Sequence, residues 1–249
     1  MRFLLASFII GSLLFLTKRL FLPPKRMLLV LLFLGGIGYF LQSTLYLTSL
    51  LFVQVSVAVL VLYTYPVFVI GISLLLGLEK VTGRLTASLV LALSGSVLVV
   101  NPIFKLDAIG VLLALGASMV YTIYILISNR VIRKVSGEVS TFYIFLSSAI
   151  SFGLLGLTTG GYRIEWSNDT WFWIIMIALF STILPVLLFF RGLKLIGPSR
   201  ASILNTAEII TSVIAASIIF QEMLLPIQML GGIFIIAANV LISLSGEGT

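Results

Sequence analysis

Long apolar runs separated by short charged segments make up almost the whole chain. Each run is close to the length of about 20 residues that an α-helix needs to cross the hydrocarbon core of a bilayer. Within the runs, apolar and polar residues do not alternate as they would in the strands of an outer-membrane barrel. The pattern predicts nine membrane-spanning helices, at residues 3–17, 27–48, 52–77, 85–100, 108–128, 139–157, 170–190, 199–220 and 223–244.

The composition agrees with this pattern. Apolar residues make up 60% of the chain and charged residues only 9%, with a mean hydropathy of +1.25. A water-soluble domain of 249 residues would need far more polar surface to cover its core. We therefore expect an all-α, polytopic helical membrane protein.

The chain contains neither cysteine nor histidine. Their absence excludes disulfides, thiol nucleophiles, Ser-His-Asp catalysis and zinc sites built on these residues. The G-x-x-x-x-G-K-[ST] motif of nucleotide hydrolases is missing as well. We expect no metal and no cofactor, and any proton carried within the membrane must be carried by a carboxylate.

Basic residues indicate how the chain is oriented. If the segment after the first span lies in the cytoplasm and the spans alternate, 12 of the 15 basic residues lie on the cytoplasmic side. Only Arg2, Lys105 and Arg163 lie outside. The positive-inside rule thus predicts an external N-terminus and a cytoplasmic C-terminus, in the cell membrane. The net charge of +7 is a topology signal, so we expect a lipid bilayer and no nucleic acid as partner.

One pattern of landmark residues occurs twice, 143 residues apart. The first copy runs through Tyr65-Pro66, Glu79, Ser88 and Gly95, and the second through Glu208-Ile209, Glu222, Gly231 and Ala238. Five predicted spans separate Glu79 from Glu222, and because five is odd the two copies have opposite orientations in the membrane. We therefore expect two inverted-topology repeats, at residues 1–102 and 103–249, an arrangement typical of transporters.

These landmarks resemble the EamA-like branch of the drug/metabolite transporter superfamily. Pro66, Glu79 and the small residues after it match the first repeat, and Glu208 stands where the second repeat often has a Glu-Pro pair. Further likeness lies in Arg191-Gly192, in Gly197-Pro198-Ser199 and in the segment 116–124.

The resemblance implies ten spans, five in each repeat, whereas nine are visible. The first repeat then has four spans and lacks its first helix. Two explanations stay open: a start codon that lies upstream of Met1, or a nine-span variant.

Glu208 is the only ionisable residue deep inside a predicted span, about 13 Å in from Ser199 at 1.5 Å per residue. A charge at that depth costs about 2.5–3.5 kcal/mol, so such residues face the interior of the bundle or a wet cavity. Glu208 either binds a cationic group of the substrate or carries a coupling proton. The structural alternative is a protonated glutamate that hydrogen-bonds a neighbouring helix. Asn205 and Ser212 share its helix face.

Three tyrosines and the motif residues complete the candidates. Tyr65 occupies the repeat position equivalent to Glu208, and Tyr121 and Tyr124 lie deep in the fifth span near Ser118. We expect them to line a midplane site, or alternatively to be interior aromatics. The resemblance assigns structural roles to Pro66, Glu79, Gly95, Glu222 and Gly231.

The sequence thus predicts a secondary transporter, not an enzyme. It would export small organic metabolites such as amino acids or amines by alternating access, driven by proton coupling or by facilitated exchange. A truncated or non-transporting scaffold is the first alternative, and a membrane-embedded enzyme the second. Lipid-facing and partner-facing apolar surfaces look alike in a sequence, so no oligomeric state is predicted.

Overall fold

A computed structural model describes residues 1–78, 80, 82–100, 107–160, 168–220 and 225–244. Every regular element in these ranges is a helix. The elements are α1 (Arg2–Leu16), α2 (Lys25–Phe33), η1 (Leu34–Tyr39), α3 (Phe40–Ser49), α4 (Val55–Leu62), α5 (Tyr65–Leu75), α6 (Gly83–Val100), α7 (Ala108–Ile132), α8 (Gly137–Thr159), α9 (Asn168–Met176), η2 (Ile177–Ile183), α10 (Leu184–Leu204), α11 (Ala207–Phe220) and α12 (Pro226–Ser243). The expected all-α fold is confirmed.

Seven helices in the described part of the chain are long and apolar enough to cross a membrane, and α1 is a shorter apolar helix. Seven differs from the nine predicted spans partly because helical turns continue past the predicted end of the seventh span, through α10 to Leu204. Many outward-facing side chains are large and apolar: Leu75 is 87% exposed and Leu195 is 82% exposed. Such surfaces suit lipid rather than water.

The helices form two compact units. Unit 1 consists of Met1–Leu41 and Ile127–Leu195, and unit 2 of Gln42–Leu126 and Ile196–Thr249. The chain passes from one unit to the other within α3, within α7, and within α10 beside its kink at Gly197.

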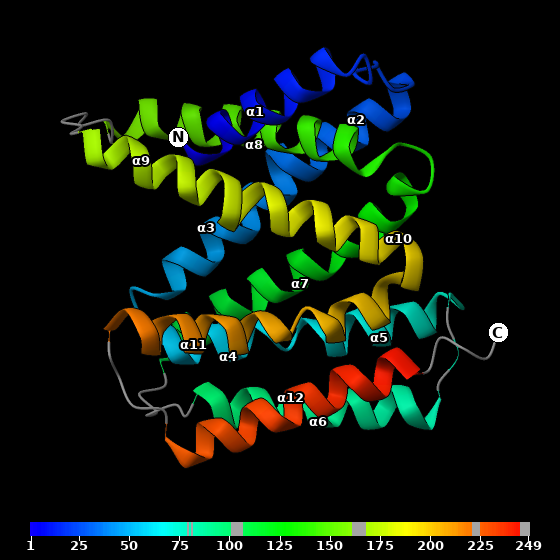
Figure 1. Cartoon of the computed structure of the whole chain (residues 1–249), viewed down its shortest axis with the longest axis vertical. Helices are drawn as coiled ribbons and strands as arrows, with labels where there is room; N and C mark the ends of the chain where they lie inside the picture. Colours follow the sequence, from blue (N-terminus) through cyan, green and yellow to red (C-terminus); the bar gives the residue numbers. More distant parts are fainter. Residues whose placement is uncertain (79, 81, 101–106, 161–167, 221–224, 245–249) are drawn as a thin grey trace. The chain divides into compact units, whose positions relative to one another are not determined.

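In unit 1, α1 and the glycine-rich π-helical segment η1 pack against α8 (Figure 1). A methyl group added to Gly35 would collide with the carbonyl oxygen of Ile144, so glycine permits this close approach. Ser148 Oγ donates to Gly35 O at 3.0 Å, and Ser151 Oγ donates to Gly36 O at 2.7 Å. Carbonyls that the wide π turn aims sideways thus find partners on α8.

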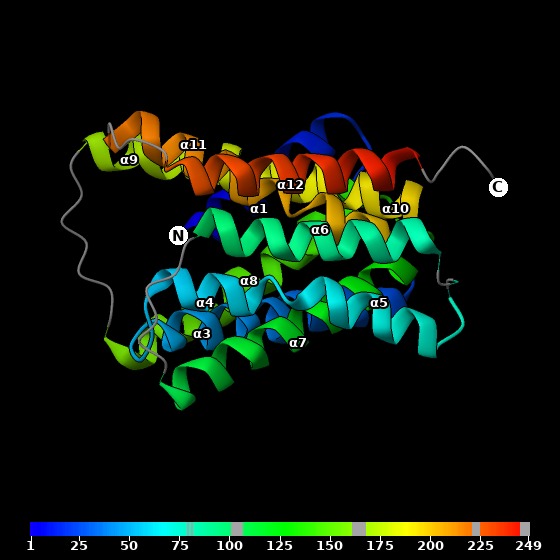
Figure 2. The ribbon, with the colours of Figure 1, turned by 90° about the horizontal axis from the view of Figure 1, so that it is seen from below.

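In unit 2, α6 and α12 lie side by side, as Figures 1 and 2 both show. Gly95 and Gly231 meet at their crossing. A Cβ atom on Gly95 would stand 2.7 Å from Gly231 O, and one on Gly231 would stand 2.7 Å from Gly95 O. This is the close helix approach that small residues allow in membranes.

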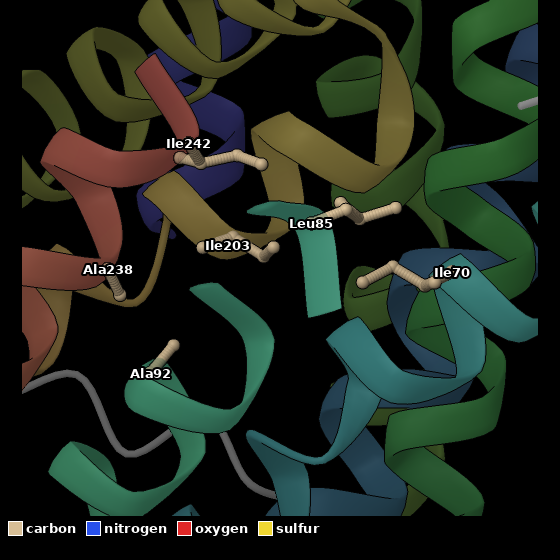
Figure 3. Close-up of a cluster of buried hydrophobic side chains, with 6 residues drawn as sticks. All are labelled: Ile70, Leu85, Ala92, Ile203, Ala238 and Ile242. Carbon is tan, nitrogen blue, oxygen red and sulfur yellow. The ribbon is translucent and has the colours of Figure 1, made fainter. Parts of the chain in front are cut away.

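A buried apolar cluster continues from this crossing (Figure 3). It comprises Ile70 of α5, Leu85 and Ala92 of α6, Ile203 of α10, and Ala238 and Ile242 of α12. The cluster ties α5 and the end of α10 to the α6–α12 pair, and the candidate site begins where these two segments meet the breaks beside them.

Candidate functional site

The third predicted span is broken in its middle. α4 ends at Leu62 and α5 begins at Tyr65, with Tyr63 and Thr64 in the turn between them. Pro66 explains the break, because it lacks an N–H group and its ring would clash with the carbonyl four residues earlier. Thr64 Oγ1 donates to Val61 O at 2.7 Å, and this carbonyl at the interrupted helix end also accepts from Thr64 N at 3.2 Å.

The eighth predicted span is broken in the same way, although it has no proline at that point. α10 ends at Leu204 and α11 begins at Ala207. Thr206 Oγ1 donates to Ile203 O at 2.7 Å, the same device as at Thr64. Side chains that bond the backbone locally compete with helical hydrogen bonding, so Asn205 and Thr206 favour this break.

Tyr65 joins the two breaks. Its ring is buried, with 1% of the residue exposed. Its hydroxyl donates to Ser202 O at 3.2 Å and accepts from Asn205 Nδ2 at 3.1 Å. The start of α5 is therefore hydrogen-bonded both to the last turn of α10 and to the turn that follows it.

Glu208 lies in the first turn of α11 with its side chain exposed. Asn205 Nδ2 donates to its Oε2 at 3.4 Å, and the buried Tyr63 is within electrostatic range of the carboxylate. A carboxylate here also suits the positive end of the helix dipole, which is the structural explanation of this residue. The helix-dipole explanation does not account for the exposure of this side chain.

The pattern-based candidates did not include Tyr63. Residues two apart on a continuous helix point in different directions, so Tyr63 and Tyr65 could not be assigned to one face. The break removes this restriction: the two rings lie 5.9 Å apart, tilted by 47°. Tyr46 of α3, half-buried, is also within electrostatic range of Glu208.

α7 supplies the remaining tyrosines. The Tyr121 ring meets that of Tyr65 edge-on at 4.8 Å, and Tyr124 stacks on Tyr121 at 6.0 Å. Hydroxyls of α7 also reach the first break: Ser118 Oγ lies 3.2 Å from Thr64 Oγ1, and Thr122 Oγ1 donates to Tyr65 O at 3.4 Å. Tyr124 is buried and Tyr121 half-buried.

The other candidates lie elsewhere. Ser212 is exposed on α11 one turn beyond Glu208, and none of the hydrogen bonds above reaches it. Pro66 is buried in the first turn of α5, and Gly95 and Gly231 form the helix crossing. Glu79 and Glu222 lie outside the described residues.

Among the predicted residues, hydrogen bonds and ring contacts therefore join Tyr65, Asn205, Glu208, Tyr121 and Tyr124 within unit 2. The group combines an exposed carboxylate-bearing residue with several aromatic rings. This combination can hold an organic cation, because the charge and the ring faces both attract it.

Comparisons with known proteins agree with the resemblance seen in the sequence. A model of the EamA-like transporter family matches residues 1–101 and 108–244. An "uncharacterized transporter" of Archaeoglobus fulgidus is 30% identical over 221 residues, which is 86% of this chain and 75% of that protein. A solved crystal structure superimposes with a TM-score of 0.82 over 99% of this chain and 86% of its own, at 16% identity, and so shows the same fold.

Proposed function

Because the chain belongs to the EamA-like transporter family, and so is a membrane transporter of the drug/metabolite kind, we propose that it exports small organic metabolites such as amines or amino acids. The observation that carries the proposal is the exposed side chain of Glu208 at a break in a membrane helix. Discontinuous helices of this kind form the substrate and ion sites of many secondary transporters.

The surroundings of Glu208 support a wet pathway. Thr211 and Ser212 follow it at the spacings of one helix face, and all three side chains are exposed. Within a membrane, a stripe with a carboxylate and two hydroxyls is far more stable against water than against lipid tails. We assign this face of α11 to the lining of the transport pathway.

Inverted repeats and alternating access form part of the proposal, and contacts between α6 and α12 support them. Gln228 Nε2 donates to Val99 O at 3.1 Å. At the equivalent positions of the other repeat stand Leu85 for Gln228 and Ile242 for Val99, and these two residues lie in one buried cluster. If a pseudo-twofold axis relates the two repeats, residues equivalent to a contacting pair are also expected to lie close together.

The test compares the culture medium of cells that overproduce the wild type, Glu208→Gln or Glu138→Gln, at matched protein levels. Glu138 is the matched control, because it undergoes the same change at an exposed ion pair with Arg191 in unit 1. We expect a few amines or amino acids to accumulate outside with the wild type and Glu138→Gln only. Equal accumulation with Glu208→Gln would return Glu208 to a structural role, and no accumulation with the wild type would contradict export.

Coupling is tested separately. Glu208 either exchanges a proton for substrate or serves only as a counter-ion during facilitated exchange. In proteoliposomes, proton exchange predicts that an imposed pH gradient drives accumulation of the exported metabolite above equilibrium, and that Glu208→Gln abolishes this. Facilitated exchange predicts equilibration without accumulation.

A further inference from the structure

The linker between α1 and α2, residues 17–24, joins two apolar helices and contains no helix itself (Figure 1). Hydrogen bonds fix its path. The N–H group of Arg19 donates to Leu14 O at 2.9 Å. The hydroxyl of Tyr143 in α8 donates to Phe21 O at 3.4 Å. The linker is therefore held to unit 1 by both α1 and α8.

Three consecutive apolar side chains of this linker are exposed. Leu20 is 37% exposed, Phe21 47% and Leu22 73%. In water such a row would be unfavourable, because none of its apolar surface would be removed from the solvent. The linker, however, connects apolar helices of a membrane transporter, so it lies at the surface of the bilayer. Acyl chains just below that surface suit the row.

A pair of exposed basic residues stands on each side of the apolar row. Lys18-Arg19 precedes it and Lys25-Arg26 follows it. Glu138 of α8 lies within electrostatic range of Arg19. That carboxylate also forms an ion pair with Arg191 at 3.4 Å, so one negative charge is shared between two guanidinium groups. The linker thus keeps an excess of positive charge.

The charges of the whole chain are divided unequally between the two units. Unit 1 has 11 of the 15 basic residues and 3 of the 8 acidic ones, whereas unit 2 has 4 and 5. The net charge is therefore +8 in unit 1 and −1 in unit 2. In the predicted orientation, nine of the 11 basic residues of unit 1 lie on the cytoplasmic side, where anionic lipids are enriched in many membranes.

We propose that the α1–α2 linker is an interfacial anchor that binds anionic phospholipids. The two basic pairs contact the headgroup phosphates, and the side chains of residues 20–22 insert among the acyl chains. An anionic phospholipid meets both requirements in one molecule. A nucleic acid would match the charges alone and would leave the apolar row in water.

The turn between α7 and α8 offers a comparison within the same unit. Arg133 and Lys134 are exposed there, but the apolar residues beside them, Val131, Ile132 and Val135, are buried. This turn therefore carries a basic pair without an exposed apolar row, and we expect it to be a weaker lipid contact.

The experiment measures the lipid selectivity of the full chain in phosphatidylcholine vesicles. The probes are spin-labelled phosphatidylglycerol and phosphatidylcholine with identical acyl chains. We expect the wild type to prefer phosphatidylglycerol about threefold or more. Replacing Lys18 and Arg19 together by glutamine should remove at least about half of this preference. The same change at Arg133 and Lys134 removes equal charge and should have a smaller effect.

A second measurement tests insertion of the apolar row. The chain has no cysteine, so a spin label on one introduced cysteine reports its own depth. At Leu22→Cys we expect the label to collide more with oxygen, which dissolves among acyl chains, than with a water-soluble nickel chelate. At Lys134→Cys we expect the reverse.

Three results would overturn the proposal: no preference of the wild type for phosphatidylglycerol, an equal loss of preference in the two double variants, or a label at residue 22 that meets mainly the nickel chelate. The last result would leave the row in water, where a soluble partner could cover it. The first and last results do not depend on the folding of a double variant. Export in the culture test is measured separately, so the proposed function does not stand or fall with this anchor.

Discussion

Gly231 and Gly232 are neighbours in α12 with opposite surroundings. A methyl group at residue 231 would meet Gly95 O and Val99 N at 2.7 Å, whereas nothing lies within 4 Å of one at residue 232. We predict that Gly231→Ala destabilises the protein by about 1–3 kcal/mol, because the backbone of α6 must move. Gly232→Ala should be neutral or slightly stabilising, since alanine favours a helix over glycine. Thermal unfolding in detergent measures the stability of both variants. Equal effects would contradict the close approach of α6 and α12 at Gly231.

The hydroxyl of Tyr65 is the second residue-scale case. Tyr65→Phe leaves Ser202 O and Asn205 Nδ2 without the partner they share. We expect a loss of about 1–3 kcal/mol in unfolding free energy, because both groups belong to a buried or partly buried network. Tyr143→Phe, whose hydroxyl is exposed, should change it by less than about 0.5 kcal/mol. The same thermal measurement compares the two variants. An equal loss of stability in both would contradict a stabilising role of the Tyr65 hydrogen bonds.

Sequence reasoning reached part of this site. Glu208 was identifiable because a carboxylate deep in an apolar span is rare, and Asn205 because it shares a helix face with Glu208. Tyr65 followed from the repeat offset. Tyr63 was missed because its place depends on a change of backbone direction between it and Tyr65, and side-chain spacing assumes a continuous helix. That these residues bind a substrate stays a prediction.

Among the elements, α10 contains one position whose backbone conformation requires glycine. Gly197 has φ 79° and ψ 173°, a conformation strained for any residue with a Cβ atom. We predict that Gly197→Ala costs about 1–3 kcal/mol and lowers the yield of folded protein. Gly192→Ala in the same helix, with open space around it, should have no such effect. Yield by size-exclusion chromatography, together with the melting temperature, separates the two.

Pro66 allows a test of the break itself. Pro66→Ala restores the missing N–H and lets α4 and α5 join into one helix. We expect transport of the exported metabolite to fall while the melting temperature stays the same or rises, since helical hydrogen bonding improves. Full transport by this variant would show that the break is dispensable.

The elements were predictable to different degrees. Apolar runs reveal where helices exist, because about 20 such residues are needed for each crossing. They do not reveal an interruption within a run. The break at Asn205-Thr206 has no proline or glycine to mark it, and asparagine and threonine disfavour a helix too weakly to locate a break by themselves.

At the scale of the whole molecule, charge asymmetry predicts orientation. The chain has no cysteine, so a single introduced cysteine reports its own side of the membrane. We expect a membrane-impermeant maleimide to label Asp107→Cys in intact cells, and Lys134→Cys only after the cells are broken open. The reverse labelling would place the C-terminus outside and contradict the positive-inside assignment.

Sequence reasoning was strongest at this scale. The helical membrane class followed from composition, and family membership from the order of landmark residues, and both are confirmed. Inverted repeats stay a prediction, because a few landmark residues at a common spacing say little about three-dimensional symmetry. The contacts of α6 with α12 are what a sequence alone could not supply.

The glycine crossing of α6 and α12 also restricts which parts of unit 2 are free to rearrange. At Gly95 and Gly231 each helix approaches a backbone carbonyl of the other, so a shift by one helical turn would bring a residue with a Cβ atom against that carbonyl. We therefore expect α6 and α12 to move together. Rearrangement of unit 2 is then expected at its two interrupted helices, where the hydroxyl of Tyr65 bonds one break to the other.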